Sequence, residues 1–284
     1  MTHEFDPGPE SAKFRDLVRN YPGPDAYPGD LFRVEWGPIF YRGRLDGTAR
    51  VLVIGQDPGQ HESVARRCMV GEAGQRVQGF LRKLGITRSY VIVNSFLYSV
   101  FGRASKAERE AFEPKIVPYR EQWLDALLLG DSDVDVVIAF GDEAKHAFEG
   151  WRGPEASPKV EVEYAGLHHP TFPEGSGMPG AMAEMLAQWN EALPRLRDAL
   201  SQHHDEPPDA TPYGTDLEDS DKGQIPERDM PPGTPPIMFS LSQWASRQHL
   251  LPDDADDDSK DEEKRATIVV KIPRKERPWT PLDQ

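Results

Sequence analysis

Four short apolar runs alternate with amphipathic stretches along the first 200 residues, and this pattern predicts an α/β fold. The apolar runs lie at residues 51–54, 90–93, 134–140 and 160–164. Continuous apolar runs rich in β-branched residues are typical of strands buried on both faces. Helical periodicity marks residues 74–84, 107–129, 142–148 and 180–200. We therefore expect a three-layer α/β/α sandwich with a central, mainly parallel four-stranded sheet that ends near residue 200.

Polar side chains follow three of the predicted strands at their carboxyl ends. Gln56 and Asp57 come after the first strand, Asn94 ends the second, and His168 and His169 follow the fourth. Each has an ordinary explanation as a helix cap, turn residue or loop residue. Because carboxyl ends of parallel strands meet at one edge of the sheet, where such folds bind ligands, together they predict a pocket.

The regions outside this pattern divide the chain into three parts. We expect an N-terminal extension with a short helix at 1–30, the α/β domain at 31–200, and an acidic, Pro-rich flexible tail at 201–284. Two apolar segments interrupt the tail, at 237–251 as a short helix and at 267–273 as a strand suited to a sheet edge. The sequence does not decide whether these segments dock on the protein's own domain or bind a protein partner.

Composition narrows the function classes. The formal net charge of −15 argues mildly against a nucleic-acid partner, but residues 201–284 hold 19 of the 48 acidic residues and only 10 of the 33 basic ones. The single cysteine, Cys68, excludes an internal disulfide, a four-cysteine zinc site and a cysteine-held iron–sulfur cluster. No apolar run approaches the length of a membrane span and no signal pattern is present, so we expect a cytoplasmic monomer without membrane contact.

Three motifs resemble those of one enzyme family. Residues 55–58 (GQDP) resemble the first motif of the prototype uracil-DNA glycosylases. Residues 91–95 (VIVNS) resemble the strand that ends in their uracil-reading Asn, and residues 169–171 (HPT) resemble their His-Pro-Ser motif. Residues 67–75 (RCMVGEAGQ) are similar to the branch that carries an iron–sulfur cluster. On these motifs the chain is identified as a member of the uracil-DNA glycosylase superfamily.

The resemblance implies a monofunctional DNA glycosylase that removes a flipped-out uracil or related pyrimidine from DNA and leaves an abasic site. Asp57 would hold the attacking water and stabilise the sugar cation, and His169 would donate a hydrogen bond to the pyrimidine O2. Asn94 would read the N3 and O4 edge, and Gln56 would contact the base. Neither a metal nor another cofactor is implied, and the partner is DNA that contains uracil or a modified pyrimidine.

Departures from the family pattern point to a wider substrate range. Gly59 stands where the prototype enzymes have a Tyr that excludes a 5-methyl group, and Met69 stands where an aromatic ring stacks on the base. Excision of a 5-modified pyrimidine, including one from foreign (phage) DNA, is therefore an alternative. No cluster is expected with Cys68 alone, and the reactive His of covalently trapping relatives is not recognisable between residues 94 and 120.

DNA contacts outside the pocket are expected from an apolar wedge and from basic residues. Phe172 is the first choice for the wedge that fills the vacated stack and Met178 the second, although Phe172 is equally suited to packing inside the domain. Candidate phosphate contacts, with a solvated basic face as the alternative, are Arg66, Arg67, Arg103 and Lys106. A non-catalytic, base-sensing DNA-binding module is a hypothesis of another class, and Asp57 argues against it.

Overall fold

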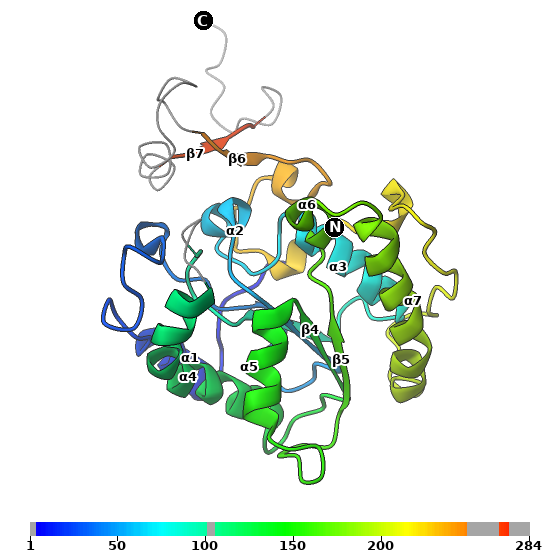
Figure 1. Ribbon diagram of the computed structural model, residues 1–284, viewed down its shortest axis with the longest axis horizontal. Coiled ribbons are helices and arrows are strands. Elements are labelled where there is room, and N and C mark those ends of the chain that lie inside the picture. The colour runs from blue at the N-terminus through cyan, green and yellow to red at the C-terminus, as the bar shows by residue number, and fades with distance from the viewer. Residues whose placement is uncertain (1–3, 101–105, 249–266, 273–284) are drawn as a thin grey trace, which may run out of the picture.

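The computed structural model describes residues 4–100, 106–248 and 267–272 of the 284-residue chain. A five-stranded sheet with the order β1-β3-β2-β4-β5 forms its centre (Figure 1). Four of its strands are parallel, namely β2 (Val51–Gly55), β3 (Tyr90–Asn94), β4 (Val136–Phe140) and β5 (Glu163–Leu167). The predicted parallel strands are confirmed. The two-residue β1 (Arg42–Gly43), which the pattern did not predict, pairs antiparallel with β3 at one edge.

Helices cover both faces of the sheet and complete the three layers. The helices are α1 (Ala12–Arg19), α2 (Gln60–Ala65), α3 (Glu72–Lys83), α4 (Lys106–Leu128), α5 (Asp142–Arg152), α6 (Phe172–Ser176) and α7 (Ala181–Ala199). Buried residues of α1, α4 and α5 form one hydrophobic cluster with one face of the sheet. Buried residues of α3 and α7 form a second cluster with the other face. The α/β/α sandwich predicted from the pattern is therefore confirmed.

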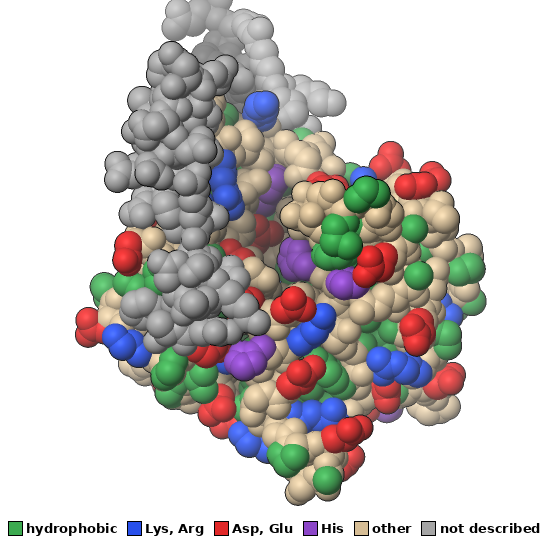
Figure 2. Space-filling view, in the orientation of Figure 1, with side chains coloured by type: hydrophobic (Ala, Val, Ile, Leu, Met, Phe, Trp, Pro, Cys, Tyr) green, Lys and Arg blue, Asp and Glu red, His purple; other side chains and the backbone are tan. Residues whose placement is uncertain are grey.

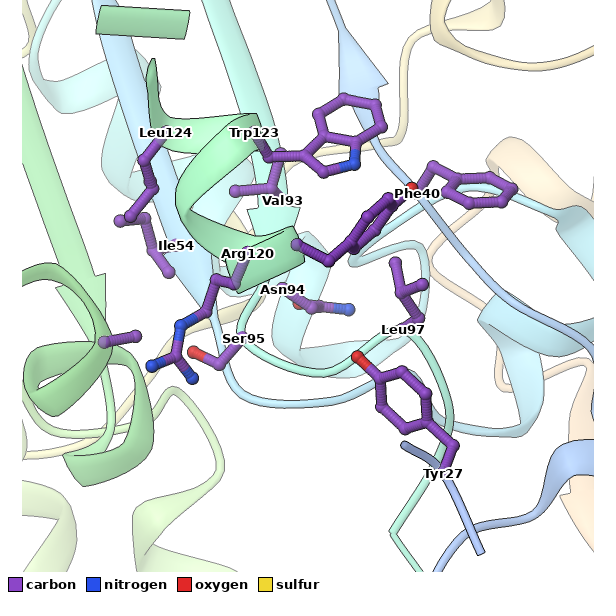
Figure 3. Close-up of a pocket in the computed structure, with 12 residues that line it drawn as sticks. Tyr27, Phe40, Ile54, Val93, Asn94, Ser95, Leu97, Arg120, Trp123 and Leu124 are labelled. Atoms are coloured by element: carbon purple, nitrogen blue, oxygen red, sulfur yellow. The ribbon is translucent and has the colours of Figure 1, made fainter. Parts of the chain in front are cut away.

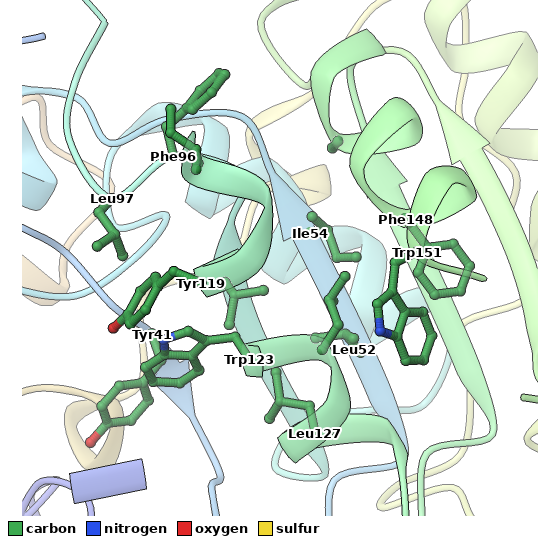
Figure 4. Packing of buried hydrophobic residues seen from close by; sticks show 14 of the residues in the cluster. Tyr41, Leu52, Ile54, Phe96, Leu97, Tyr119, Trp123, Leu127, Phe148 and Trp151 are labelled. Atoms are coloured by element: carbon green, nitrogen blue, oxygen red, sulfur yellow. The ribbon is translucent and has the colours of Figure 1, made fainter. Parts of the chain in front are cut away.

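Alternate side chains of the central strand β2 enter opposite layers. Leu52 and Ile54 pack with aromatic residues of α4 and α5, which Figure 4 shows as Trp123 on one side and Trp151 on the other. Val51 and Val53 are fully buried in the cluster under α3 and α7. Burial of a Val or Leu side chain contributes about 1.5–3 kcal/mol. A strand with two buried faces has no polar alternation, which explains its continuously apolar sequence.

The segment after α7 packs on this sandwich. Tyr213 lies in the cluster under α7, and Ile225, Met230 and Trp244 form a third cluster with residues next to α2. A buried ion pair at 2.9 Å also joins Asp229 to Arg42 of β1. The expectation of a flexible tail does not hold for residues 201–248. Sparse apolar residues that each fill a separate site on the domain leave no periodic pattern for sequence reasoning to detect.

The two predicted docking segments meet in a small sheet. Residues 236–248 contain a 3₁₀ turn, η4 (Pro236–Phe239), and a strand, β6 (Ala245–Arg247), in place of the expected helix; residues 249–251 of that predicted segment lie outside the described residues. β6 pairs antiparallel with β7 (Ile268–Val270), so the second segment is a strand as expected. The remaining 3₁₀ turns are η1 (Val34–Trp36), η2 (Asp219–Asp221) and η3 (Glu227–Asp229). The acidic run at 253–263 lies outside the described residues.

No helix within the described part of the chain is both long and apolar enough to cross a bilayer.

Candidate active site

A cavity of about 440 Å³ lies at the carboxyl edge of the sheet. Its walls come from the loops after β2 and β5, from α2 and the start of α3, and from the segment that leads into β6. In the face shown in Figure 2 the molecule is hollowed near its top, and acidic, histidine and basic side chains surround the hollow. The sequence-predicted residues in its wall are Gln56, Asp57, Gly59, Met69 and His169.

Asp57 lies in this wall directly after β2. Its Oδ2 accepts a hydrogen bond of 2.9 Å from the backbone N–H of Val100. Burial raises the pKa of the Asp57 carboxyl, and the Val100 N–H and the positive charges of Arg247 and Arg33 oppose this shift. The carboxylate is thus held by the Val100 N–H, and the charges of Arg247 and Arg33 offset part of the rise in its pKa that burial causes.

His169 reaches the same cavity from the loop after β5. Its Nδ1 accepts a hydrogen bond of 3.2 Å from the backbone N–H of Thr171, and the Thr171 hydroxyl lies 3.0 Å from the same nitrogen. Burial lowers the pKa of His169 to about 4, so the ring is neutral at pH 7. Because Nδ1 is an acceptor, the single ring proton lies on Nε2. His169 is therefore a neutral hydrogen-bond donor through Nε2.

Glu62 joins the two loops that frame the cavity. Its Oε2 accepts the N–H of Gly59 at 2.9 Å, and its Oε1 accepts the N–H groups of Val70 and Gly71 at 2.7 and 2.9 Å. The buried carboxylate thereby ties the loop after β2 to the loop before α3. Sequence reasoning missed Glu62, although a Glu three residues after the N-cap residue, here Gly59, is a known sign of a helix N-terminus.

Asn94 is not among the described residues that line this cavity. It ends β3 and borders a second, smaller cavity of about 20 Å³ with Tyr27, Phe40 and Trp123, as Figure 3 shows. Within the described residues, neither Oδ1 nor Nδ2 of Asn94 has a hydrogen-bond partner, and both atoms are buried. A buried amide group without a partner costs about 1–3 kcal/mol, so this side chain calls for a ligand or another explanation.

Met69 lines the larger cavity and also lies close to Asn94. A Cβ atom on Gly55 would collide with both Asn94 Oδ1 and Met69 Cε, so these two side chains meet above Gly55. Met69 also has a left-handed backbone, with a φ of 49°. The structure thus brings Asp57 and His169 into one cavity and places Asn94 beside the flexible Met69 side chain of its wall.

Two of the arginines predicted to contact DNA, Arg66 and Arg67, make bonds within the fold. The Arg66 guanidinium donates to the carbonyls of Trp36 at 2.7 Å and Pro38 at 2.8 Å. Arg67 forms an ion pair of 2.7 Å with Asp6. Both side chains support neighbouring loops, and contact with DNA stays a prediction for them. Residue 103 and the side chain of residue 106 lie outside the description.

The two candidates for the apolar wedge differ in exposure. Phe172 begins α6, stacks on the ring of His168 at a centroid distance of 4.2 Å and packs against the cluster under α7. Met178 follows α6 and is 53% exposed. A side chain that enters a base stack has to be free of the core, so the structure favours Met178, the second choice from the sequence.

The segment around β6 supplies wall residues that no motif indicated. Gln243 and Arg247 line the cavity together with residues of the motifs. The segment is attached to α2, because Nε2 of His61 accepts the N–H of Ala245 at 3.1 Å and the Trp244 ring packs edge-on against the His61 ring. Nothing local in the sequence marks these residues as part of a site.

Comparison with known proteins agrees with this geometry. A family model described as the uracil DNA glycosylase superfamily matches residues 42–190, which is more than half of the 284 residues. The matched range contains all five strands of the central sheet together with Asp57, Asn94 and His169, and it ends before the segment that carries Arg247. A search of curated proteins found no match. The chain belongs to the uracil-DNA glycosylase superfamily.

Proposed function

We propose that this superfamily member is a monofunctional glycosylase that hydrolyses the N-glycosidic bond of uracil or a related pyrimidine turned out of DNA. The observation that carries the proposal is the Asn94 amide, whose donor and acceptor are both buried and unpaired among the described residues, beside the cavity of Asp57 and His169. The N3–H and O4 of uracil complement this amide. Pairing with them would remove the cost of two orphaned polar atoms.

Asp57 and His169 are suited to the charges that develop when the bond breaks. The sugar becomes positive, and an ionised Asp57 stabilises it and holds the water that attacks C1′. The departing base becomes negative at O2, and the neutral His169 donates to it through Nε2. A neutral imidazole suits this task, because its Nε2 proton is present at pH 7 and the neutral ring needs no negatively charged neighbour. Both groups line a cavity within the size range of small-molecule sites.

Met69 has to move before a base can reach Asn94. Its methyl group meets the Asn94 amide above Gly55, so it occupies the entrance to that amide. An unbranched thioether changes rotamer easily, and the displaced side chain would then lie against the face of the base. The backbone of this loop stays in place, because Glu62 holds the following residues, Val70 and Gly71.

Gly59 supports a second candidate substrate, a pyrimidine with a substituent at C5. Gly59 lines the cavity, and a Cβ built on it would meet only Glu62 Oε2, at 3.0 Å, within 4 Å. No side chain therefore fills the cavity at this position. The proposal includes 5-modified pyrimidines, such as those of foreign DNA, as substrates beside uracil.

Oligonucleotides with uracil, 5-hydroxymethyluracil or modified cytosines, assayed for alkali-induced strand breaks, test both candidates. We expect base release by the wild-type protein, and its loss in Asp57→Asn while DNA binding persists. DNA binding by the wild type without abasic sites would refute a glycosylase and favour a base-sensing module. Release of uracil alone would refute the second candidate.

A further inference from the structure

The wall of the active-site cavity carries more negative than positive charge. Asp57, Glu62 and Glu72 line it, and Arg247 is the only Lys or Arg among its described lining residues. The charge of Glu72 is offset by an ion pair of 2.6 Å with Arg76, whereas Glu62 and Asp57 bond only to backbone N–H groups among the described residues. The whole chain has a formal net charge of −15. A nucleotide turned into this cavity has a phosphate on each side, and those phosphates are repelled by the acidic wall. A cation at the cavity would offset this repulsion.

Arg247 is placed to be that cation. It is the last residue of β6, its side chain is exposed, and its guanidinium lies 5.4 Å from the centroid of the Trp36 ring. Within the described residues it has neither a hydrogen bond nor an ion pair in the structure, whereas Arg66 and Arg67 are engaged inside the fold. A guanidinium stays charged at all working pH values, and its fork of N–H groups matches phosphate oxygens.

The strand that carries Arg247 is firmly attached to the catalytic domain. Trp244 is 1% exposed and packs against His61 of α2 at a ring distance of 4.7 Å. The Ala245 N–H donates to the same His61, and β7 pairs along the whole of β6. The backbone that carries Arg247 is therefore held against the catalytic domain.

We infer that Arg247 binds a phosphate of the DNA strand next to the turned-out nucleotide, so that the segment beyond the family region is part of the DNA-binding site. This inference rests on the proposed function, because it assigns a DNA contact to the same cavity. The opposing interpretation is that Arg247 only balances the charge of Asp57 and does not touch DNA.

The salt dependence of DNA binding separates the two interpretations. Each neutralised phosphate contributes about 0.9 to the slope of log affinity against log salt. The full chain and its Arg247→Gln variant are titrated against a duplex with a non-cleavable abasic-site analogue, between about 50 and 200 mM salt. We expect the slope of Arg247→Gln to fall by about one and its affinity at low salt to fall roughly tenfold. Arg247→Lys should keep most of the slope.

Lys159→Gln is the matched control. Lys159 is exposed in the loop before β5, at the amino ends of the parallel strands and thus at the opposite edge of the sheet, and its loss changes the charge equally. It should bind like the wild type, and both Gln variants should unfold at the wild-type temperature. Equal slopes for Arg247→Gln and wild type, or an equal loss in Lys159→Gln, would overturn the inference.

The experiments also distinguish an error in the proposed function from an error in the role of Arg247. A wild-type protein that binds the duplex but releases no base refutes the glycosylase activity, and the slopes still decide the role of Arg247. A wild-type protein that does not bind DNA overturns both.

Discussion

Replacement of Asn94 by leucine should stabilise the protein and at the same time remove most of its activity. Leucine has nearly the shape of asparagine, and the Asn94 amide atoms are buried without partners among the described residues. Each orphaned group costs about 1–3 kcal/mol, whereas an apolar group of the same shape costs little. After allowance for imperfect packing, we expect the free energy of unfolding to rise by about 1–3 kcal/mol. The melting temperature should rise by roughly 2–4 °C for each kcal/mol.

The expected loss of activity follows from the same two atoms. If Asn94 pairs with the base only in the complex, Asn94→Leu removes two hydrogen bonds worth about 2–4 kcal/mol together. Base release under single-turnover conditions should then slow by roughly 30- to 1000-fold. Denaturant unfolding measures the first effect, and quenched strand-break assays measure the second.

Asn190→Leu is the matched control for this experiment. Asn190 lies on α7, where its Nδ2 donates to the Tyr213 carbonyl at 2.9 Å and its Oδ1 accepts the Tyr213 N–H at 2.8 Å. The same substitution there breaks two satisfied bonds, so it should lower stability by about 2–4 kcal/mol and leave the rate of base release nearly unchanged in the folded protein. Equal destabilisation by Asn94→Leu would show that the Asn94 amide is satisfied in the free protein and would refute the reasoning.

Three further outcomes follow from the site. Burial lowers the pKa of His169 from 6.5 to about 4, so between these pH values the unfolded chain binds more protons than the folded protein. The contribution of the neutral His169 to the free energy of unfolding is therefore fully present above pH 6.5 and decreases as the pH falls toward 4. His169→Gln should flatten this slope in unfolding measurements, and an unchanged slope would contradict a neutral His169. Glu62→Gln replaces one acceptor oxygen by an NH₂ donor beside three backbone N–H groups. It should lower the free energy of unfolding by about 1–3 kcal/mol and slow base release. Wild-type stability and a wild-type rate would show that the loops do not depend on Glu62. Gly59→Tyr places a ring in the cavity and should reduce the release of 5-substituted pyrimidines at least about tenfold relative to the release of uracil. An equal effect on uracil and on 5-substituted pyrimidines would argue against selection at C5.

The apolar pattern alone was sufficient to predict the four parallel strands and to place Asp57 and His169 at one edge of the sheet. A strand buried on both faces needs a continuous apolar run, and the parallel arrangement puts the residues after β2 and β5 at one edge. Asp57 and His169 therefore share a cavity, as the order of strands and helices predicted. These features depend on short-range periodicity, which a single sequence contains.

Other parts of the site depend on contacts between distant segments. The left-handed backbone at Met69 places its side chain over Asn94, and no periodic pattern encodes that conformation. Arg66 and Arg67 had the charge expected of phosphate contacts, but nearby carbonyls and Asp6 engage them once the chain folds.

The sequence by itself thus determined the layers, the edge of the sheet that carries the candidate site and the chemical groups present there. Tertiary structure decided which groups face the cavity, that residues 201–248 pack on the domain, and that Arg247 joins the wall. The physical reason is that periodicity reports which side of an element is buried. The partner of each buried or charged side chain is instead selected by packing and hydrogen bonding between segments far apart in the chain.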